Sequence, residues 1–173
     1  AINPDGTFKY QVTYGRSWNK SFPDTRSTPV IDGSRIYVQS GMGQVSCINK
    51  EDGEFIWTKD VDADFESEYH YWGNSETPLI IDDLIIVSPG GKKANIVAYN
   101  KTSGELVWQT LPFEGTRAYA SATIYEWNGF RFILALNGTH MLALKPETGE
   151  IAWTYRWHNP AKWTQPGLIW TNT

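Results

Sequence analysis

The chain lacks the features that mark several protein classes. Its 173 residues contain a single cysteine, which rules out an internal disulfide framework. The net charge is -4 and there is no long basic run, which argues against nucleic-acid binding because that binding rests on a concentrated positive surface. The longest apolar run, around IYEWNGFRFILAL, is interrupted by charges and by Gly129, so no transmembrane helix is expected. No window shows sustained helical periodicity.

Aromatic residues and turn formers are abundant instead. The chain has 9 Trp, 9 Tyr and 7 Phe, and its 15 Gly and 9 Pro are spread along the sequence. Short apolar runs between such turn signals are typical of an all-β architecture. The length is sufficient for one domain with a sizeable core.

A short motif recurs along the chain. GEFIW at residues 53–57 returns as GELVW at 104–108 and as GEIAW at 149–153, and a weaker copy, GTFKY, stands at 6–10. The copies are about 45 to 50 residues apart, the spacing of supersecondary units. The repeat therefore predicts several similar units stacked in sequence.

Each motif is predicted to form a hairpin in which glycine takes the positive φ of the turn. Beyond the turn, a period of two places Phe55 and Trp57 on one face, and likewise Leu106 with Trp108 and Ile151 with Trp153. A large apolar pair on the same face suits the stacking of one unit on the next. The residues expected to dock neighbouring units are Tyr10, Trp57, Trp108 and Trp153, with the turn glycines Gly53, Gly104 and Gly149.

A second pair of strands precedes each hairpin, within TPVIDGSRIYVQSG, TPLIIDDLIIVSPG and ATIYEWNGFRFILAL. Four antiparallel strands in about 45 to 50 residues make a β-propeller blade. We predict an all-β fold: a propeller arc of three four-stranded antiparallel blades, at 27–60, 75–111 and 119–156, plus one extra N-terminal strand at 7–14. Such an arc is expected to belong to a propeller of about six to eight blades and to cover its open faces by self-association or with the remainder of its parent.

The repeat resembles a known family. The tract A-x-x-x-x-[ST]-G-E-x-x-W, present as AYNKTSGELVW and ALKPETGEIAW, is similar to the repeat of PQQ-like propellers, which include quinoprotein alcohol dehydrogenases and BamB-like assembly lipoproteins. The resemblance implies a periplasmic, secreted or envelope-associated bacterial protein. Its repeat residues are structural, so it leaves the function open. The chain is expected to be a non-catalytic binding or assembly module, and the alternative is a fragment of a PQQ-dependent alcohol or sugar dehydrogenase. A third alternative is a carbohydrate-processing or polysaccharide-binding role, since exposed Trp and Tyr can stack on sugars.

The dehydrogenase alternative implies, by the same resemblance, a quinone in the central channel. It would lie over a tryptophan floor beside a vicinal Cys-Cys disulfide, with calcium on Glu and Asn side chains and an Asp as base. Cys47 is alone, and it aligns with Ala98 and Ala143, six residues before each turn glycine, which indicates a small buried position. No catalytic residue and no metal ligand is therefore assigned, and PQQ and calcium are expected only under this alternative.

The acidic run DVDADFESE at 60–68 suggests a calcium loop, but Phe65 and Tyr71 stand where an EF-hand needs Gly and Glu. A solvated connecting loop is the preferred interpretation. His70, His140 and His158 are isolated in sequence, which does not suit zinc.

The candidate binding residues lie in the long loops. In a propeller, the loops that lead from each outer strand to the next blade share a face with those joining the two middle strands, whereas the opposite face receives short turns such as EDG, TSG and EWNG. Long irregular loops usually carry function, so we expect a protein, small-molecule or carbohydrate ligand there. Alternatively, the aromatic residues only cover the blade ends. All three histidines are expected on this face, with no metal between them. The candidates are His70, Tyr71, Trp72, Asn74, Lys92, Arg117, Tyr119, His140, Arg156, Trp157 and His158.

Overall fold

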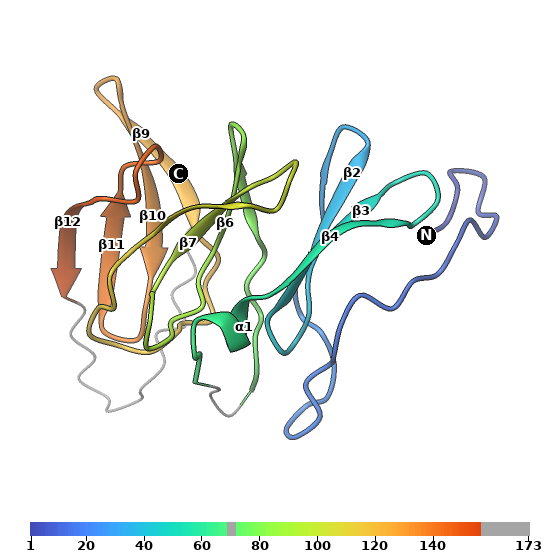
Figure 1. The fold of residues 1–173 in the computed structure, drawn as a ribbon, viewed down its shortest axis with the longest axis horizontal. Helices are drawn as coiled ribbons and strands as arrows, with labels where there is room; N and C mark the ends of the chain where they lie inside the picture. The colour runs from blue at the N-terminus through green and yellow to red at the C-terminus, as the bar shows by residue number, and fades with distance from the viewer. Residues whose placement is uncertain (69–71, 157–173) are drawn as a thin grey trace.

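A computed structural model describes residues 1–68 and 72–156 (Figure 1). It contains three four-stranded antiparallel sheets, in each of which the strand order follows the chain. The predicted all-β arc of three four-stranded blades is confirmed. Sheet 1 comprises β1 (Val30–Asp32), β2 (Arg35–Gln39), β3 (Gln44–Asn49) and β4 (Phe55–Asp60). Sheet 2 comprises β5 (Leu79–Ile81), β6 (Leu84–Val87), β7 (Val97–Asn100) and β8 (Leu106–Gln109). Sheet 3 comprises β9 (Thr123–Trp127), β10 (Phe130–Leu136), β11 (His140–Leu144) and β12 (Ile151–Arg156).

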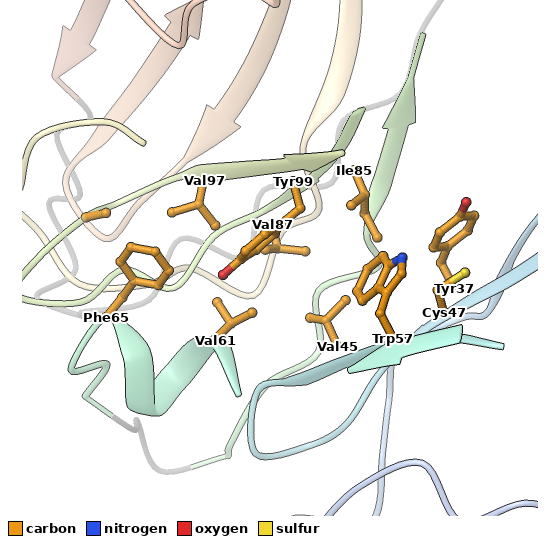
Figure 2. Packing of buried hydrophobic residues seen from close by; sticks show 11 residues of the cluster. Tyr37, Val45, Cys47, Trp57, Val61, Phe65, Ile85, Val87, Val97 and Tyr99 are labelled. Carbon is orange, nitrogen blue, oxygen red and sulfur yellow. The ribbon is translucent and has the colours of Figure 1, made fainter. Parts of the chain in front are cut away.

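The sheets pack face to face through two apolar clusters. Figure 2 shows the first, in which Tyr37, Cys47 and Trp57 of sheet 1 point towards Ile85 and Tyr99 of sheet 2. A second cluster fills the space between sheets 2 and 3. Cys47 is fully buried, and burial raises the pKa of its thiol, which suits a small core residue.

In sheets 1 and 2, a tryptophan lies over the turn glycine of the next sheet. The Trp57 ring occupies the space that a side chain at Gly104 would need, and its Nε1 donates a hydrogen bond to the Lys101 carbonyl at 3.1 Å. Trp108 packs in the same way over Gly149, and its Nε1 donates at 2.8 Å to the carbonyl three residues before that glycine. Both tryptophans are buried. The indole thus combines apolar burial with a satisfied polar atom.

Tyr10 occupies the corresponding position against sheet 1. Its ring packs over Gly53, and its hydroxyl donates to the Lys50 carbonyl at 3.0 Å. The fourth aromatic residue differs, because Trp153 remains 40% exposed. Trp153 was expected to dock a neighbouring unit and therefore to be buried like Trp57 and Trp108. That expectation is wrong for Trp153, which packs over none of the described turn glycines.

A β-bulge interrupts the last strand of each sheet, β4, β8 and β12. The two apolar residues that were expected to share one face of that strand therefore lie on opposite faces. Cys47 pairs with Trp57, whereas the next residue, Ile48, pairs with Phe55, so one residue of β4 has no partner. Paired residues share a face and successive residues alternate, so Phe55 lies on the face opposite Trp57. Phe55 is accordingly exposed. The same shift separates Leu106 from Trp108 and Ile151 from Trp153.

The N-terminal segment is less regular than expected. Residues 7–14 contain no named strand, and their backbone pairing is limited to an isolated antiparallel bridge between Ile2 and Phe8. A ladder needs a neighbouring strand, and among the described residues none runs beside this segment. The acidic run after sheet 1 also departs from a plain loop, because its first residues form the short helix α1 (Val61–Asp64).

The two ends of the sheets carry different connections. The two-residue turns within the β1–β2, β5–β6 and β9–β10 hairpins lie at one end, which we call the short-turn face (Figure 1). The helix α1 and the connections between sheets lie at the other, which we call the long-loop face.

Candidate functional site

Part of the predicted site falls outside the described residues. The candidates outside the described residues are His70, Tyr71, Trp157 and His158. The expected grouping of the three histidines on one face therefore stays a prediction. The described candidates divide into a buried polar cluster, an aromatic cavity and exposed ion pairs.

Arg117 is the centre of the buried polar cluster and is not available to a ligand. It is 6% exposed, and its guanidinium forms a two-pronged ion pair with Asp62 of α1, which is 3% exposed. Its Nε donates to the Ser88 carbonyl at 2.8 Å, and one Nη donates to the Pro89 carbonyl at 2.7 Å. Bidentate pairs of this kind fix geometry as well as charge. The prediction of Arg117 as a ligand-binding residue is therefore not supported by its contacts.

The same contacts correct the interpretation of the acidic run. Asp62 was expected in a solvated loop, but α1 turns its carboxylate inward against Gly43 of the β2–β3 turn. Gly43 has a φ of +75, and a Cβ there would collide with this carboxylate. The backbone of Arg117 also forms an isolated β-bridge with Asn137. Arg117 therefore links the loops of all three sheets through its side chain and its backbone together.

Glu76 is a buried carboxyl group that the sequence did not reveal. Burial raises its pKa to about 7, against the opposing effect of hydrogen bonds from the amide and hydroxyl of Ser88 at 2.8 and 2.7 Å. Arg117 lowers this pKa and Asp62 raises it, so Glu76 is electrically coupled to the ion pair. It lies three residues before β5, the first strand of its blade, where the sequence alone gave no signal of burial.

Asn74 is also buried, and its side chain serves the local backbone. Its Oδ1 accepts a hydrogen bond from the Glu76 amide at 3.1 Å. The Nδ2 atom of Asn74 and both side-chain polar atoms of Gln39 have no hydrogen-bond partner among the described residues. These amides are polar groups buried inside the arc, not surface contacts.

Trp72 and Tyr119 are the two candidates that the structure brings together at a cavity. Their ring centroids are 5.6 Å apart at an interplanar angle of 57°, and the Trp72 amide donates to the Tyr119 hydroxyl at 3.3 Å. With Phe22, Arg26 and Ser75 they line a hollow of about 330 Å³. Arg26 directs its guanidinium to main-chain carbonyls, including those of Phe22 and Trp72. The arginine therefore supports the wall, and the rings supply the contact surface.

The remaining described candidates make ordinary structural contacts. His140 is buried, its Nδ1 lies 2.8 Å from the Thr139 hydroxyl, and its ring meets Phe113 edge to face. Lys92 pairs with Glu68 at 3.4 Å, and Arg156 pairs with Glu114 at 3.3 Å. Both pairs are largely exposed, and exposed pairs contribute little to stability.

The buried cluster does not fit a calcium–quinone centre. Within residues 1–68 and 72–156, no group of three or more His, Cys, Asp or Glu side chains is placed to hold a metal. Both carboxylate oxygens of Glu76 accept from Ser88, and the Asn74 oxygen is turned onto the backbone. Cys47 lies in the core between sheets. The side-chain oxygens of Glu76 and Asn74, which calcium would need as ligands, are thus already engaged by protein donors.

The family is identified by the extent of its match. A family model described as Outer membrane protein assembly factor BamB matches residues 7–164. The chain belongs to this family. The PQQ-like resemblance of the repeat is thereby confirmed, and the stacked sheets described above are the blades of this β-propeller family.

Individual relatives include assembly factors and a dehydrogenase. Outer membrane protein assembly factor BamB of Pseudomonas aeruginosa is 34% identical over 61 residues, covering 32% of this chain and 16% of that protein. Quinoprotein alcohol dehydrogenase PedH of Pseudomonas putida is 29% identical over 91 residues, covering 50% of this chain and 15% of that protein. The crystal structure of BamB from Moraxella catarrhalis aligns with a TM-score of 0.52 at 22% identity, covering 76% of this chain and 36% of that one, which shows the shared fold.

The chain spans about a third or less of the length of these relatives. The comparisons establish a PQQ-like propeller with similarity to both BamB-like assembly factors and quinoprotein dehydrogenases.

Proposed function

We propose that this chain is part of a non-catalytic propeller module that binds a polypeptide partner through its long-loop face in the bacterial envelope. The observation that carries the proposal is the cavity of about 330 Å³ lined by Phe22, Trp72 and Tyr119. Around it, the charged groups are engaged in structure, since Arg26 holds main-chain carbonyls and Arg117 is buried against Asp62. Within residues 1–68 and 72–156, the face offers aromatic contact area without an acid–base pair placed for chemistry.

An apolar side chain from an extended polypeptide suits this cavity. Phe22 is exposed at its rim, and large aromatic residues around a small pocket are the usual anchors of protein interfaces. The relatives' name, outer membrane protein assembly factor, indicates clients whose strands alternate apolar and polar residues over about ten positions. Such a strand presents an apolar side chain at every second residue, so one of them can enter the cavity while its neighbours face solvent.

Binding of a defined peptide tests this proposal. The probe is a fluorescent ten-residue peptide copied from a transmembrane strand of an outer membrane protein, and the control is its scrambled sequence. Fluorescence anisotropy should show saturable binding that Trp72→Ala weakens roughly tenfold, because one buried aromatic contact is worth about 1 to 2 kcal/mol. Tyr119→Phe, which keeps the ring, should weaken binding less than Tyr119→Ala.

A control at a distant exposed aromatic residue completes the experiment. Phe55 is exposed on β4, so Phe55→Ala removes a ring of similar accessibility away from the cavity. Equal loss in Trp72→Ala and Phe55→Ala, or equal binding of the scrambled peptide, would refute a specific site.

The second candidate function is a fragment of a PQQ-dependent alcohol or sugar dehydrogenase. The similarity to PedH over half of the chain favours it. The full-length protein would be mixed with PQQ and calcium and examined for bound-quinone absorbance and dye-linked oxidation of alcohols or sugars. Neither signal is expected, and the appearance of both would replace the binding-module proposal.

The envelope location rests on the relatives' names, and it forms part of the same proposal. No helix among the described residues has both the length and the apolar character to cross a bilayer. Fractionation of cells expressing the full-length protein tests the location directly, and recovery in the cytoplasm would contradict it.

A further inference from the structure

The β9–β10 hairpin departs from the repeat in its length. β1 and β2 form three residue pairs before their turn, as do β5 and β6, whereas β9 and β10 form five. The additional pairs are Glu126 with Arg131 and Trp127 with Phe130. Two residues of extended chain add roughly 7 Å, so the tip projects beyond the equivalent turns. Figure 1 shows this hairpin rising past the others on the short-turn face.

The turn chemistry makes the extension a rigid platform. Asn128 and Gly129 both have positive φ, at 48 and 78, which is the signature of a two-residue Asn-Gly hairpin turn. Such turns match the twist of the strands that they join, so the register of the flanking pair is fixed. The tip is therefore an ordered extension of sheet 3.

The pairing places four aromatic rings on one face of this hairpin. Trp127 pairs with Phe130, and Tyr125 pairs with Phe132, and residues two apart along a strand share a face. The rings of Phe130 and Phe132 are stacked, with centroids 6.4 Å apart. Trp127 is 59% exposed and Phe130 is 62% exposed. We call the four rings the aromatic platform.

The opposite face of the hairpin is polar and holds the platform in place. Arg131 forms an ion pair with Asp82 at the β5–β6 turn of sheet 2 and lies 4.0 Å from Glu147. This contact orients the platform away from sheet 2. A further blade with a hairpin as short as those of sheets 1 and 2 would have no strand pairs at the level of Trp127 and Phe130.

We infer that the aromatic platform is a binding site for a neutral saccharide chain. Residues 126–131 line a hollow of about 410 Å³, which falls in the size range of small-ligand sites. The C–H groups of a sugar ring carry partial positive charge and pack on the negative faces of aromatic rings. Asn128 stands at the same tip, in the turn between Trp127 and Phe130, and its side-chain amide can donate and accept hydrogen bonds with sugar hydroxyls.

The surroundings argue against the other ligands of exposed aromatic residues. On the other face of the hairpin tip, the three carboxylates of Asp82, Glu126 and Glu147 surround Arg131 and outnumber its charge, so the field around the tip disfavours an anionic lipid surface or an acidic glycan. A stable protein interface needs roughly 800 Å² from each partner, and one hairpin tip cannot supply that area. A chain of neutral sugars needs only two or three rings and nearby hydroxyl partners.

Titration of the full chain with cellotetraose and with tetra-N-acetylchitotetraose tests the inference. Saturation-transfer NMR and calorimetry should detect binding of at least one of the two. Trp127→Ala and Phe130→Ala should each weaken it about tenfold, as expected for the loss of one stacked ring. Phe55→Ala is the matched control, because it removes an exposed ring from another strand, and it should leave affinity within about twofold.

A shortened hairpin separates binding from folding. Deletion of residues 126, 127, 130 and 131 keeps the Asn-Gly turn and gives sheet 3 the hairpin length of sheets 1 and 2. It should retain the wild-type circular dichroism spectrum and abolish saccharide binding. Absence of binding by the wild-type chain at millimolar sugar, or an equal loss in Phe55→Ala, would overturn the inference. So would Trp127-dependent sedimentation with phosphatidylcholine vesicles in place of sugar binding, since that would assign the platform to a lipid surface.

Discussion

Arg117 and Asp62 are 55 residues apart in sequence and form an ion pair in which both side chains are almost completely buried. The pair connects the helix that follows sheet 1 to the segment that precedes sheet 3, while two further N–H groups of Arg117 donate to carbonyls of the β6–β7 loop. Its position gives it a structural role at the long-loop face, next to the cavity proposed for a partner.

Loss of one member of this pair should be costly. Asp62→Asn leaves the guanidinium buried without its counter-charge, and removal of one partner of a buried pair costs about 3 to 5 kcal/mol. The unfolding free energy from urea titration measures this effect. The matched control is Glu68→Gln, which breaks the exposed pair with Lys92 and should cost less than about 1 kcal/mol. A similar small effect in both variants would contradict the assigned role.

The turn glycines should be sensitive to a single methyl group. Gly104→Ala places a Cβ against the Trp57 ring at a residue with φ of +72. We expect a loss of about 1 kcal/mol from the backbone conformation and a further 1 to 3 kcal/mol from overpacking. Gly33 has φ of +58 and nothing within 4 Å of an added Cβ, so Gly33→Ala reports the backbone part alone. Chemical denaturation of both variants gives the difference, and equal losses would show that the ring contact is unimportant.

Stability should fall as the pH rises through the titration of Glu76. Its folded pKa is raised from 4.5 to about 7, so the folded state binds the proton more tightly than the unfolded state. The contribution of the protonated carboxyl group to the free energy of unfolding is fully present below about pH 4.5, and it is lost progressively as the pH rises to about 7. Glu76→Gln removes this titration while keeping an acceptor for the Ser88 amide.

The difference between wild type and Glu76→Gln isolates this carboxyl group from the others. At pH 8 the variant should be the more stable by an amount on the order of 3 kcal/mol, and the two should converge near pH 4. Unfolding free energies measured across pH 4 to 8 provide the comparison, with Glu68→Gln as the exposed control. A constant difference over the whole range would refute the raised pKa.

The repeat made the blades predictable, because glycine and tryptophan at fixed spacing define both the turn and the interblade contact. The sequence alone does not show the extra residue at each bulge. Phe55 was therefore expected on the same face as Trp57, whereas the strand pairing places the two on opposite faces. Nor could it pair Asp62 with Arg117, since that contact depends on where α1 directs its side chains after sheet 1. Local pattern fixes a blade, whereas polar contacts between blades depend on their arrangement in space.

The candidate site could also be predicted only in part from the sequence. Trp72 and Tyr119 were expected on the long-loop face because of their loop positions, and the structure places their rings in contact. Phe22 and Arg26 complete the cavity from the N-terminal segment, which lies before the first blade and outside the repeat. Composition alone gave no reason to connect that segment with residues 72–119.

The three repeat tryptophans should differ in their contribution to stability. Trp108→Ala removes a buried indole and its hydrogen bond to a carbonyl of sheet 3, and the truncation of a large core aromatic residue costs about 3 to 5 kcal/mol. Trp57→Ala should cost a similar amount, since Trp57 makes the equivalent contact with sheet 2. Trp153 occupies the same strand position but is 40% exposed, so Trp153→Ala should cost less than about half as much. Urea midpoints and slopes of the three variants, measured under one condition, give the ranking. A Trp153→Ala loss equal to that of Trp108→Ala would mean that a further surface covers Trp153 in solution, and a concentration-dependent midpoint would identify that surface as a second copy of the chain.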